Sequence, residues 1–257
     1  MRVRQIALLA RDLEKTVGDL CAVFDLEVAF RDPGVAAFGL VNAVLPVGDS
    51  FLEVVSPVRN DASAARLLAR RGGDCGYMVI VQTEDLAAAR ERMRREQVRI
   101  VFEHAHPSGH TATIHLHPSD VGGAILSLDE SKPATSWDWA GPEWERHAKT
   151  GVVTALAAAT LASDDPAGLA AHWGSLLDRT ASALGGGVFV IALDHEALRF
   201  VPAEGHGDGF VGVDLAIANG AARGPAFARA RARGLRVEGD TVWIAGTALR
   251  LVDAATP

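Results

Sequence analysis

The stretch that decides the fold lies near the start of the chain and reads Gln5-Ile6-Ala7-Leu8-Leu9-Ala10-Arg11-Asp12-Leu13-Glu14. Residues Ile6–Ala10 form an apolar run that is typical of a buried strand. Asp12 is a favourable helix N-cap, and Glu14 lies in the first turn, where the helix dipole stabilises a carboxylate. Apolar residues then recur at helical spacing as far as Phe24. The stretch therefore predicts a strand that runs directly into an amphipathic helix.

The order of one strand, one helix and three strands occurs twice in the first half of the chain. Turn residues separate the predicted strands. The first copy continues with strands at Glu27–Phe30, Ala36–Pro46 and Ser50–Ser56. The second copy has a strand at Tyr77–Val81, a helix that begins at Thr83-Glu84-Asp85-Leu86, and strands at Val98–Phe102, Thr111–His117 and Ala124–Leu128. Residues Asn60–Arg71 predict a linking helix with its cap at Asn60-Asp61.

Two fainter copies occupy the second half. The third has a strand at Val152–Leu161, a helix that begins at Asp164-Asp165-Pro166, and strands at Val188–Leu193 and Ala197–Pro202. The fourth has a strand at Phe210–Ile217, a helix over Ala221–Arg233, and strands at Leu235–Val237 and Thr241–Val252. The arginines of that last helix are expected to form a solvated face. Four copies of one plan predict two domains, 1–130 and 150–257.

The segment 131–149 between these domains has a different composition. It contains Pro133, Pro142 and three of the five tryptophans, Trp137, Trp139 and Trp144. We expect a linker whose indoles pack onto a neighbouring surface.

Composition excludes several classes of protein. The net charge of −7 argues against nucleic-acid binding, which needs a basic face. No apolar run approaches the roughly 20 residues of a membrane span, and the run Ile6–Ala10 is too short for a signal peptide. Cys21 and Cys75 are too few for a disulfide framework. The sequence predicts a cytoplasmic protein with a small-molecule ligand or substrate, either a monomer or a homodimer.

Three motifs in this order resemble the vicinal oxygen chelate superfamily. They are Ala10-Arg11-Asp12-Leu13-Glu14 before the first helix, Leu52-Glu53-Val54-Val55-Ser56-Pro57 in the last strand of the first copy, and His117-Pro118-Ser119-Asp120-Val121-Gly122-Gly123-Ala124 in the second. The superfamily includes glyoxalase I, methylmalonyl-CoA epimerase, extradiol dioxygenases and bleomycin-resistance proteins. The resemblance implies an α+β fold in which four βαβββ units form two glyoxalase-like half-barrel domains.

The resemblance also implies a divalent metal site with one ligand from the first and one from the last strand of each unit. Gln5, seven residues before Asp12, and Glu53 occupy the two positions of the first unit. They would hold Zn, Ni, Mn or Fe in the N-terminal domain. The second unit departs from this pattern, because Met78 or Tyr77 and then Ser127 stand at its two positions. Such a metal site is incomplete.

The same counting places Ala158 and Gly212 at the first-strand positions of the second domain, with Arg199 and Arg250 on its last strands. Because arginine cannot bind a cation, no metal is expected in this domain. The two arginines would bind an anionic ligand, pair with acids of the chain such as Asp194 or Asp214, or lie at the rim of the cup.

His115 and His117 alternate on one face of a predicted strand. If that face lines the cup of the half-barrel, either imidazole could bind a metal ion or ligand, or act as a base. If it faces outward, the two histidines belong to an ordinary polar surface.

These features favour a glyoxalase-like lyase, isomerase or epimerase that acts in the cup of the N-terminal domain. Glu53 and His117 would move a proton next to a carbonyl group. The ligand would contact a larger set of residues: Tyr77, Met78, His115, Ser127, Arg199 and Arg250. Two alternatives remain open. One is a metal-free protein that binds or sequesters a small molecule, as bleomycin-resistance proteins do, and the other is a paired-domain scaffold.

Overall fold

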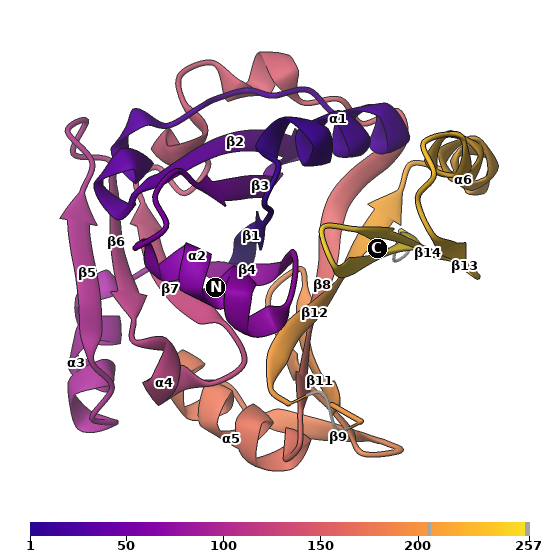
Figure 1. Cartoon of the computed structure of the whole chain (residues 1–257). Helices are drawn as coiled ribbons and strands as arrows, with labels where there is room; N and C mark the ends of the chain where they lie inside the picture. Colours follow the sequence, from indigo (N-terminus) through magenta and orange to yellow (C-terminus); the bar gives the residue numbers. More distant parts are fainter. Residues whose placement is uncertain (205–206, 255–257) are drawn as a thin grey trace. The chain divides into compact units, whose positions relative to one another are not determined.

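The computed structural model describes residues 1–204 and 207–254 (Figure 1). The chain divides into two compact units. Unit 1 contains Met1–Arg4, Tyr77–Asp138 and Ala158–Val211, and unit 2 contains Gln5–Gly76, Trp139–Ala157 and Gly212–Pro257. Each unit therefore combines one predicted copy from the first half of the chain with one from the second. The domain boundary at 131–149 stays a prediction.

Unit 2 holds the first and fourth copies. The first copy consists of β1 (Arg2–Leu9, from Gln5 onward in this unit), α1 (Leu13–Phe24), a 3-10 helix (Pro33–Phe38), β2 (Leu40–Val47), β3 (Ser50–Pro57) and α2 (Ser63–Arg71). The fourth consists of β12 (Gly209–Ile217), a 3-10 turn (Gly220–Ala222), α6 (Arg223–Ala232), β13 (Val237–Glu238), β14 (Thr241–Ile244) and β15 (Thr247–Asp253). Two 3-10 turns lie in the segment 131–149: Asp138–Ala140, at the boundary of the two units in sequence, and Trp144–His147, within unit 2.

Unit 1 holds the second and third copies. The second consists of β4 (Cys75–Thr83), α3 (Leu86–Arg95), β5 (Ile100–Ala105), β6 (Thr111–Leu116), the short helix α4 (Pro118–Val121) and β7 (Ile125–Ser131). The third consists of β8 (Val153–Ser163), α5 (Pro166–Leu177), β9 (Ala181–Gly185), β10 (Val188–Ala192) and β11 (Ala197–Pro202). In Figure 1, β5, β6 and β7 run side by side, and α4 lies near α5. No helix in the described part of the chain is long and apolar enough to cross a membrane.

One register recurs in all four copies. The last strand of each copy runs parallel to the first strand, and the remaining strands add in antiparallel order on the outer side of the last. The paired residues at corresponding places are Ala7 and Glu53, Ile80 and Ser127, Thr160 and Arg199, and Asp214 and Arg250. The register therefore makes Glu53, Ser127, Arg199 and Arg250 equivalent positions, and confirms the counting from the sequence.

Helix N-caps follow the sequence closely. Asp12 accepts a hydrogen bond from the backbone N–H of Lys15, and Asp85 and Asp165 cap α3 and α5 in the same way. Each carboxylate satisfies an N–H that the first turn leaves without a partner. Helices α2 and α6 begin without a side-chain cap. For α2, which begins at Ser63, the predicted cap at Asn60-Asp61 is therefore wrong.

Several predicted strands differ from the structure. Residues Glu27–Phe30 form no strand; a single bridge between Phe30 and Val44 remains where that strand was expected. The strand β9 was not predicted, because its small residues lack an apolar alternation. The predicted strand Thr241–Val252 is a hairpin. Ala245 and Gly246 both have positive φ, as a tight two-residue turn requires, and a side chain at Gly246 would collide with the backbone carbonyl of Asp74.

Helix α6 packs against α1 through its arginines. Arg229 donates two hydrogen bonds to the carbonyl oxygen of Val23 in the last turn of α1. Arg233 Nε lies 2.7 Å from Oδ1 of the buried Asp19, which also pairs with Lys15 at 2.8 Å. The prediction that these arginines form a solvated face is therefore wrong for the half-buried Arg229, whereas Arg233 is exposed and also pairs with Asp19. The guanidinium group of Arg233 balances the charge of the buried Asp19 carboxylate. That of Arg229 donates to a carbonyl oxygen at the C-terminal end of α1, where the helix itself supplies no N–H.

Replacing Asp19 should destabilise unit 2. Asp19→Asn removes the charge that both Lys15 and Arg233 face, so we expect a loss of about 2 kcal/mol in the free energy of unfolding. Urea denaturation at pH 7 measures it. The exposed carboxylate of Asp25, 3.9 Å from Lys149, provides the matched control, and Asp25→Asn should change stability by less than about 0.5 kcal/mol. Equal effects of the two substitutions would contradict this account of the helix contact.

Candidate functional site

The most distinctive polar cluster of unit 2 is formed by Gln5, Asn42 and Glu53. Gln5 Nε2 donates to Glu53 Oε2 at 2.9 Å, and Asn42 Nδ2 donates to Glu53 Oε1 at 2.6 Å. All three side chains are buried, with exposed fractions of 3%, 4% and 7%. Each comes from a different strand, β1, β2 and β3. Both oxygens of a buried carboxyl group therefore meet neutral amide donors.

Apolar residues surround this cluster. The pairing of β1, β2 and β3 places Ala7, Val44, Phe51 and Val55 on the same face as Glu53. Burial raises the pKa of Glu53 above its ordinary value, against the opposing effect of the two amide hydrogen bonds. A carboxyl group with a raised pKa holds its proton more tightly, so it is a stronger base when ionised.

The residues of this cluster do not fit the metal site that the resemblance implies. Gln5 presents its amide nitrogen to Glu53, and the single anionic donor of the cluster is already bound by two amides. No group of three or more His, Cys, Asp or Glu side chains suited to a metal ion occurs in residues 1–204 and 207–254. We therefore derive no chemical step through a metal ion.

A second buried polar cluster lies in unit 1. Thr113 Oγ1 lies 2.8 Å from Ser127 Oγ, and both hydroxyls donate to Asp129. Ser127 stands at the position of Glu53 in the repeat, and the carboxylate has moved two residues along the same face, to Asp129. The sequence analysis identified Ser127 but missed Asp129, because its predicted strand ended at Leu128, whereas β7 continues to Ser131.

His115 lies on the same face, paired with Ser127 across β6 and β7. Its ring lies 4.9 Å from that of Phe102 on β5. Burial lowers the pKa of His115 to about 4, so the imidazole is neutral at pH 7. A neutral imidazole can accept or donate a hydrogen bond without a charge.

His117 lies outside the strand to which the sequence analysis assigned it, because β6 ends at Leu116. It lies just beyond β6 as the N-cap of α4, where its Nδ1 accepts from the backbone N–H of Ser119 at 3.1 Å. The same nitrogen lies 3.2 Å from a guanidinium nitrogen of Arg99, which also pairs with Asp120. The ring therefore stabilises a turn. His117 and Glu53 belong to different units, and a catalytic role for His117 stays a prediction.

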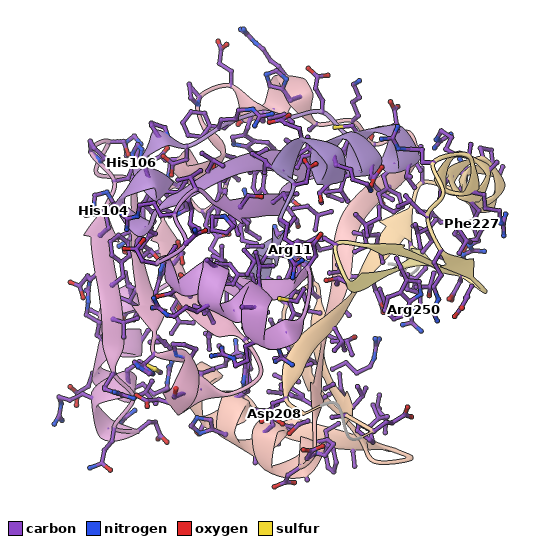
Figure 2. The ribbon with its side chains drawn as sticks, viewed as in Figure 1. Arg11, His104, His106, Asp208, Phe227 and Arg250 are labelled. Atoms are coloured by element: carbon purple, nitrogen blue, oxygen red, sulfur yellow. The ribbon has the colours of Figure 1, made fainter. Side chains whose placement is uncertain are left out.

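The other histidines of this stretch gather near the β5–β6 hairpin. Figure 2 labels His104 and His106 at that end of β5. His106 Nδ1 lies 2.9 Å from Ser108 Oγ and 3.4 Å from the carboxylate of Asp138. These contacts connect the hairpin to the segment that follows β7.

Tyr77 and Met78 were alternatives for one position, and the strand register separates them. Met78 pairs with Ile125, two residues before the pair of Ile80 and Ser127, and so corresponds to Gln5 in the first copy. Tyr77 is the neighbouring residue and points to the opposite face of β4. Met78 is buried and offers a thioether where the first copy has an amide. A ligand contact by either residue stays a prediction.

Arg199 and Arg250, the two arginines that the sequence analysis placed on the last strands, each contact a residue of their own unit. Arg250, labelled in Figure 2, binds Asp214 with two hydrogen bonds, one of them 2.9 Å from Nε to Oδ1. Arg199 Nη1 donates to Thr160 Oγ1 at 3.1 Å. For Arg250, this is the pairing with a neighbouring acid that the sequence analysis left as an alternative. An anion-binding role for either arginine stays a prediction.

Two tryptophans of the segment 131–149, Trp137 and Trp144, pack onto neighbouring side chains, as the sequence predicts. Within unit 1, the guanidinium group of Arg4 lies 5.5 Å from the ring centre of Trp137. Within unit 2, Trp144 meets Phe51 edge to face with ring centres 4.9 Å apart. Since Phe51 lies two residues before Glu53 on the same face of β3, Trp144 covers the apolar surroundings of the Gln5–Asn42–Glu53 cluster.

The repeated strand–helix–strand plan and the buried carboxyl group define a class of α+β proteins built from paired βαβββ units. The chain belongs to the glyoxalase-like domain family, whose model matches residues 6–177, within the vicinal oxygen chelate superfamily. A hypothetical protein from Staphylococcus aureus has the same fold over 98% of both chains, with a TM-score of 0.68 and 12% sequence identity. This likeness extends the fold to the second half of the chain.

Curated proteins similar to this chain include mitochondrial methylmalonyl-CoA epimerases. The mitochondrial methylmalonyl-CoA epimerase of Bos taurus is 25% identical over 131 residues, which cover 51% of this chain and 74% of the relative. The mitochondrial methylmalonyl-CoA epimerase of Homo sapiens is 21% identical over the same length and shares of the two chains. The similarity covers half of this chain.

The metal content of the purified protein checks the reading of the Gln5–Asn42–Glu53 cluster. Protein prepared without chelators should contain clearly less than one equivalent of Zn, Ni, Mn or Fe by elemental analysis, because the cluster offers a single anionic donor. The control is the double variant Gln5→Ala/Glu53→Ala, which should have the same metal content. Near-stoichiometric metal in the wild-type protein that disappears in this variant would contradict the prediction and show that Gln5 and Glu53 bind a metal ion.

The neutral His115 should make the protein sensitive to acid. The unfolded chain binds a proton on this imidazole near pH 6.5, whereas the folded chain binds it only near pH 4. The stability due to neutral His115 is therefore complete above pH 6.5 and is lost as the pH falls towards 4, by up to about 3 kcal/mol. Denaturation curves at pH 7 and 4.5 measure this loss, which should be smaller in His115→Gln. The control is His117→Gln, which changes a half-buried histidine and should retain the loss.

Proposed function

We propose that this chain is a glyoxalase-like enzyme of the isomerase class that moves a proton at a carbon atom next to a carbonyl group. Glu53 is the residue that accepts and returns the proton. The substrate is an acyl-CoA thioester with a substituted α-carbon, the class to which the substrate of the named relatives belongs. The cluster of Gln5, Asn42 and Glu53 in the N-terminal half is the site of the reaction.

The observation that carries this proposal is the buried carboxyl group of Glu53. An α-proton next to a thioester is a weak acid, so its removal needs a base that is stronger than an exposed carboxylate. Burial among Phe51, Val44 and Val55 supplies that strength, because it raises the pKa of Glu53. The family match and the epimerase relatives support the same class of reaction.

The proposed step transfers one proton. The Glu53 carboxylate takes the α-proton, the electron pair of the C–H bond forms a carbon–carbon double bond, and the π pair of the carbonyl group moves onto its oxygen, so that an enolate forms. A proton from solvent that reaches the other face of the α-carbon gives the epimer. Glu53 gives its own proton back to the first face, which regenerates the substrate, or to solvent, which restores the carboxylate. The amides of Gln5 and Asn42 remain bound to the carboxyl oxygens and keep the group in place.

A metal-free binding protein is the second candidate. The observation that favours it is that both oxygens of Glu53 already accept hydrogen bonds, which is how buried polar groups are stabilised without any reaction. Such a protein would hold the ligand against the apolar face without exchanging its protons.

Isotope exchange tests the proposed function. In D2O, the wild-type protein should incorporate deuterium at the α-carbon of methylmalonyl-CoA or a related 2-substituted acyl-CoA, as followed by proton NMR. Glu53→Gln keeps the shape of the side chain and cannot take up the proton, so the exchange rate should fall by about 100-fold or more. Glu14→Gln, which changes an exposed carboxylate paired with Arg31, is the matched control and should leave the rate unchanged.

The alternatives give different results. A thioester that raises the melting temperature of the wild-type protein without any exchange would identify a binding protein. Exchange that survives in a folded Glu53→Gln variant would show that another group moves the proton.

A further inference from the structure

Asn42 is a polar residue that the sequence analysis did not identify. It lies on β2, where it pairs with Val55, while Val44 pairs with Glu53. Asn42 and Glu53 are therefore diagonal neighbours on one face of two antiparallel strands, a spacing that long side chains can bridge. The bridge is the hydrogen bond of 2.6 Å from Asn42 Nδ2 to Glu53 Oε1.

The orientation of the Asn42 amide is determined by the backbone. Its Oδ1 accepts a hydrogen bond from the N–H of Asp32 at 2.8 Å. Because a backbone N–H can only donate, the carbonyl end of the amide must face Asp32, and the NH2 end must face Glu53. Asp32 is itself held in place, since its carboxylate accepts from the N–H of Gly34 at the start of the 3-10 helix.

Two donors at opposite oxygens restrict the carboxyl group. The terminal torsion of a glutamate is otherwise soft, with a broad range of orientations. Rotation of the Glu53 carboxyl group would break the bonds to Asn42 and Gln5 together. Because the group is buried, no water replaces the lost donors at low cost. Asn42 therefore couples the carboxyl plane of Glu53 to the backbone at Asp32.

We infer that Asn42 is a positioning residue, which orients the Glu53 carboxyl group for the proton transfer. The inference rests on the proposed function. Asn42 does not take part in the chemistry; it limits the directions from which Glu53 can approach an α-proton. A general base must meet its proton within hydrogen-bonding distance and in line, and small misplacements cost about 100-fold in rate.

Steady-state kinetics of the exchange reaction test this inference. Asn42→Ala removes the donor, and we expect kcat to fall about 10- to 100-fold while KM stays within about twofold. Asn42→Ser keeps a shorter donor and should recover part of the loss. Val41→Ala changes the exposed neighbour of Asn42 on the same strand and is the matched control, with kinetics equal to those of the wild type.

A spectroscopic measurement accompanies the kinetics and does not need activity. In nitrogen-15-labelled wild-type protein, the side-chain amide protons of Asn42 should be strongly separated in chemical shift by the bond to the carboxyl group. This separation should collapse in Glu53→Ala. An infrared band of the Glu53 carboxyl group, identified by its loss in Glu53→Gln, should shift in Asn42→Ser.

The outcomes separate two failures. A folded Asn42→Ala variant with wild-type kcat, or Asn42 amide protons that do not respond to Glu53→Ala, overturns the positioning role while the proposed function stands. A wild-type protein that exchanges no α-proton overturns the proposed function, and Asn42 then holds a carboxyl group that performs no reaction. A fall in kcat with little change in KM, together with the two spectral shifts, supports the inference.

Discussion

The burial of one carboxyl group between two amides is the constraint on which the candidate site depends. Glu53 lies among apolar side chains, where an unpaired charge would be very unfavourable. Gln5 and Asn42 supply the compensation, and they come from the strands on either side of β3. The strand order of unit 2 thus decides the chemistry of Glu53, because only neighbouring strands can present both donors. Burial raises the pKa of Glu53, whereas the two amides that hold the carboxyl group oppose this rise.

Comparison of the four copies shows how one backbone plan accommodates different side chains. The parallel pairing of first and last strands is kept in every copy, yet the equivalent position carries Glu53, Ser127, Arg199 or Arg250. In the second copy the carboxylate is at Asp129, where hydroxyl groups replace the amides. In the fourth copy the acid, Asp214, lies on the first strand, β12, and its partner Arg250 lies on the last strand, β15, whereas in the first copy the acid lies on the last strand. The backbone register is therefore more uniform than the site chemistry.

Much of the fold could be predicted from the sequence, because local signals decide it. Asp12 and Asp165 mark helix starts by their own hydrogen bonds, and counting from Asp12 located Gln5. The role of Asn42 could not be predicted, since its contact with Glu53 depends on which residues of β2 and β3 face each other across a hairpin. The contacts of Arg229 and Arg233 escaped prediction for a similar reason: their partners lie more than 200 positions away in sequence.

The make-up of the compact units has a consequence for fragment design. Each unit draws one copy from either half of the gene product, and α1 receives both its C-terminal cap and the counterion of Asp19 from α6. If the polypeptide were cut in the segment 131–149, Asp19 and the Val23 carbonyl oxygen would lie in one fragment, and Arg229 and Arg233 in the other. Each fragment would then lack the partners of these groups. The two halves of the chain therefore complement each other, and co-expression of the fragments is a more promising route to a folded product than expression of either one.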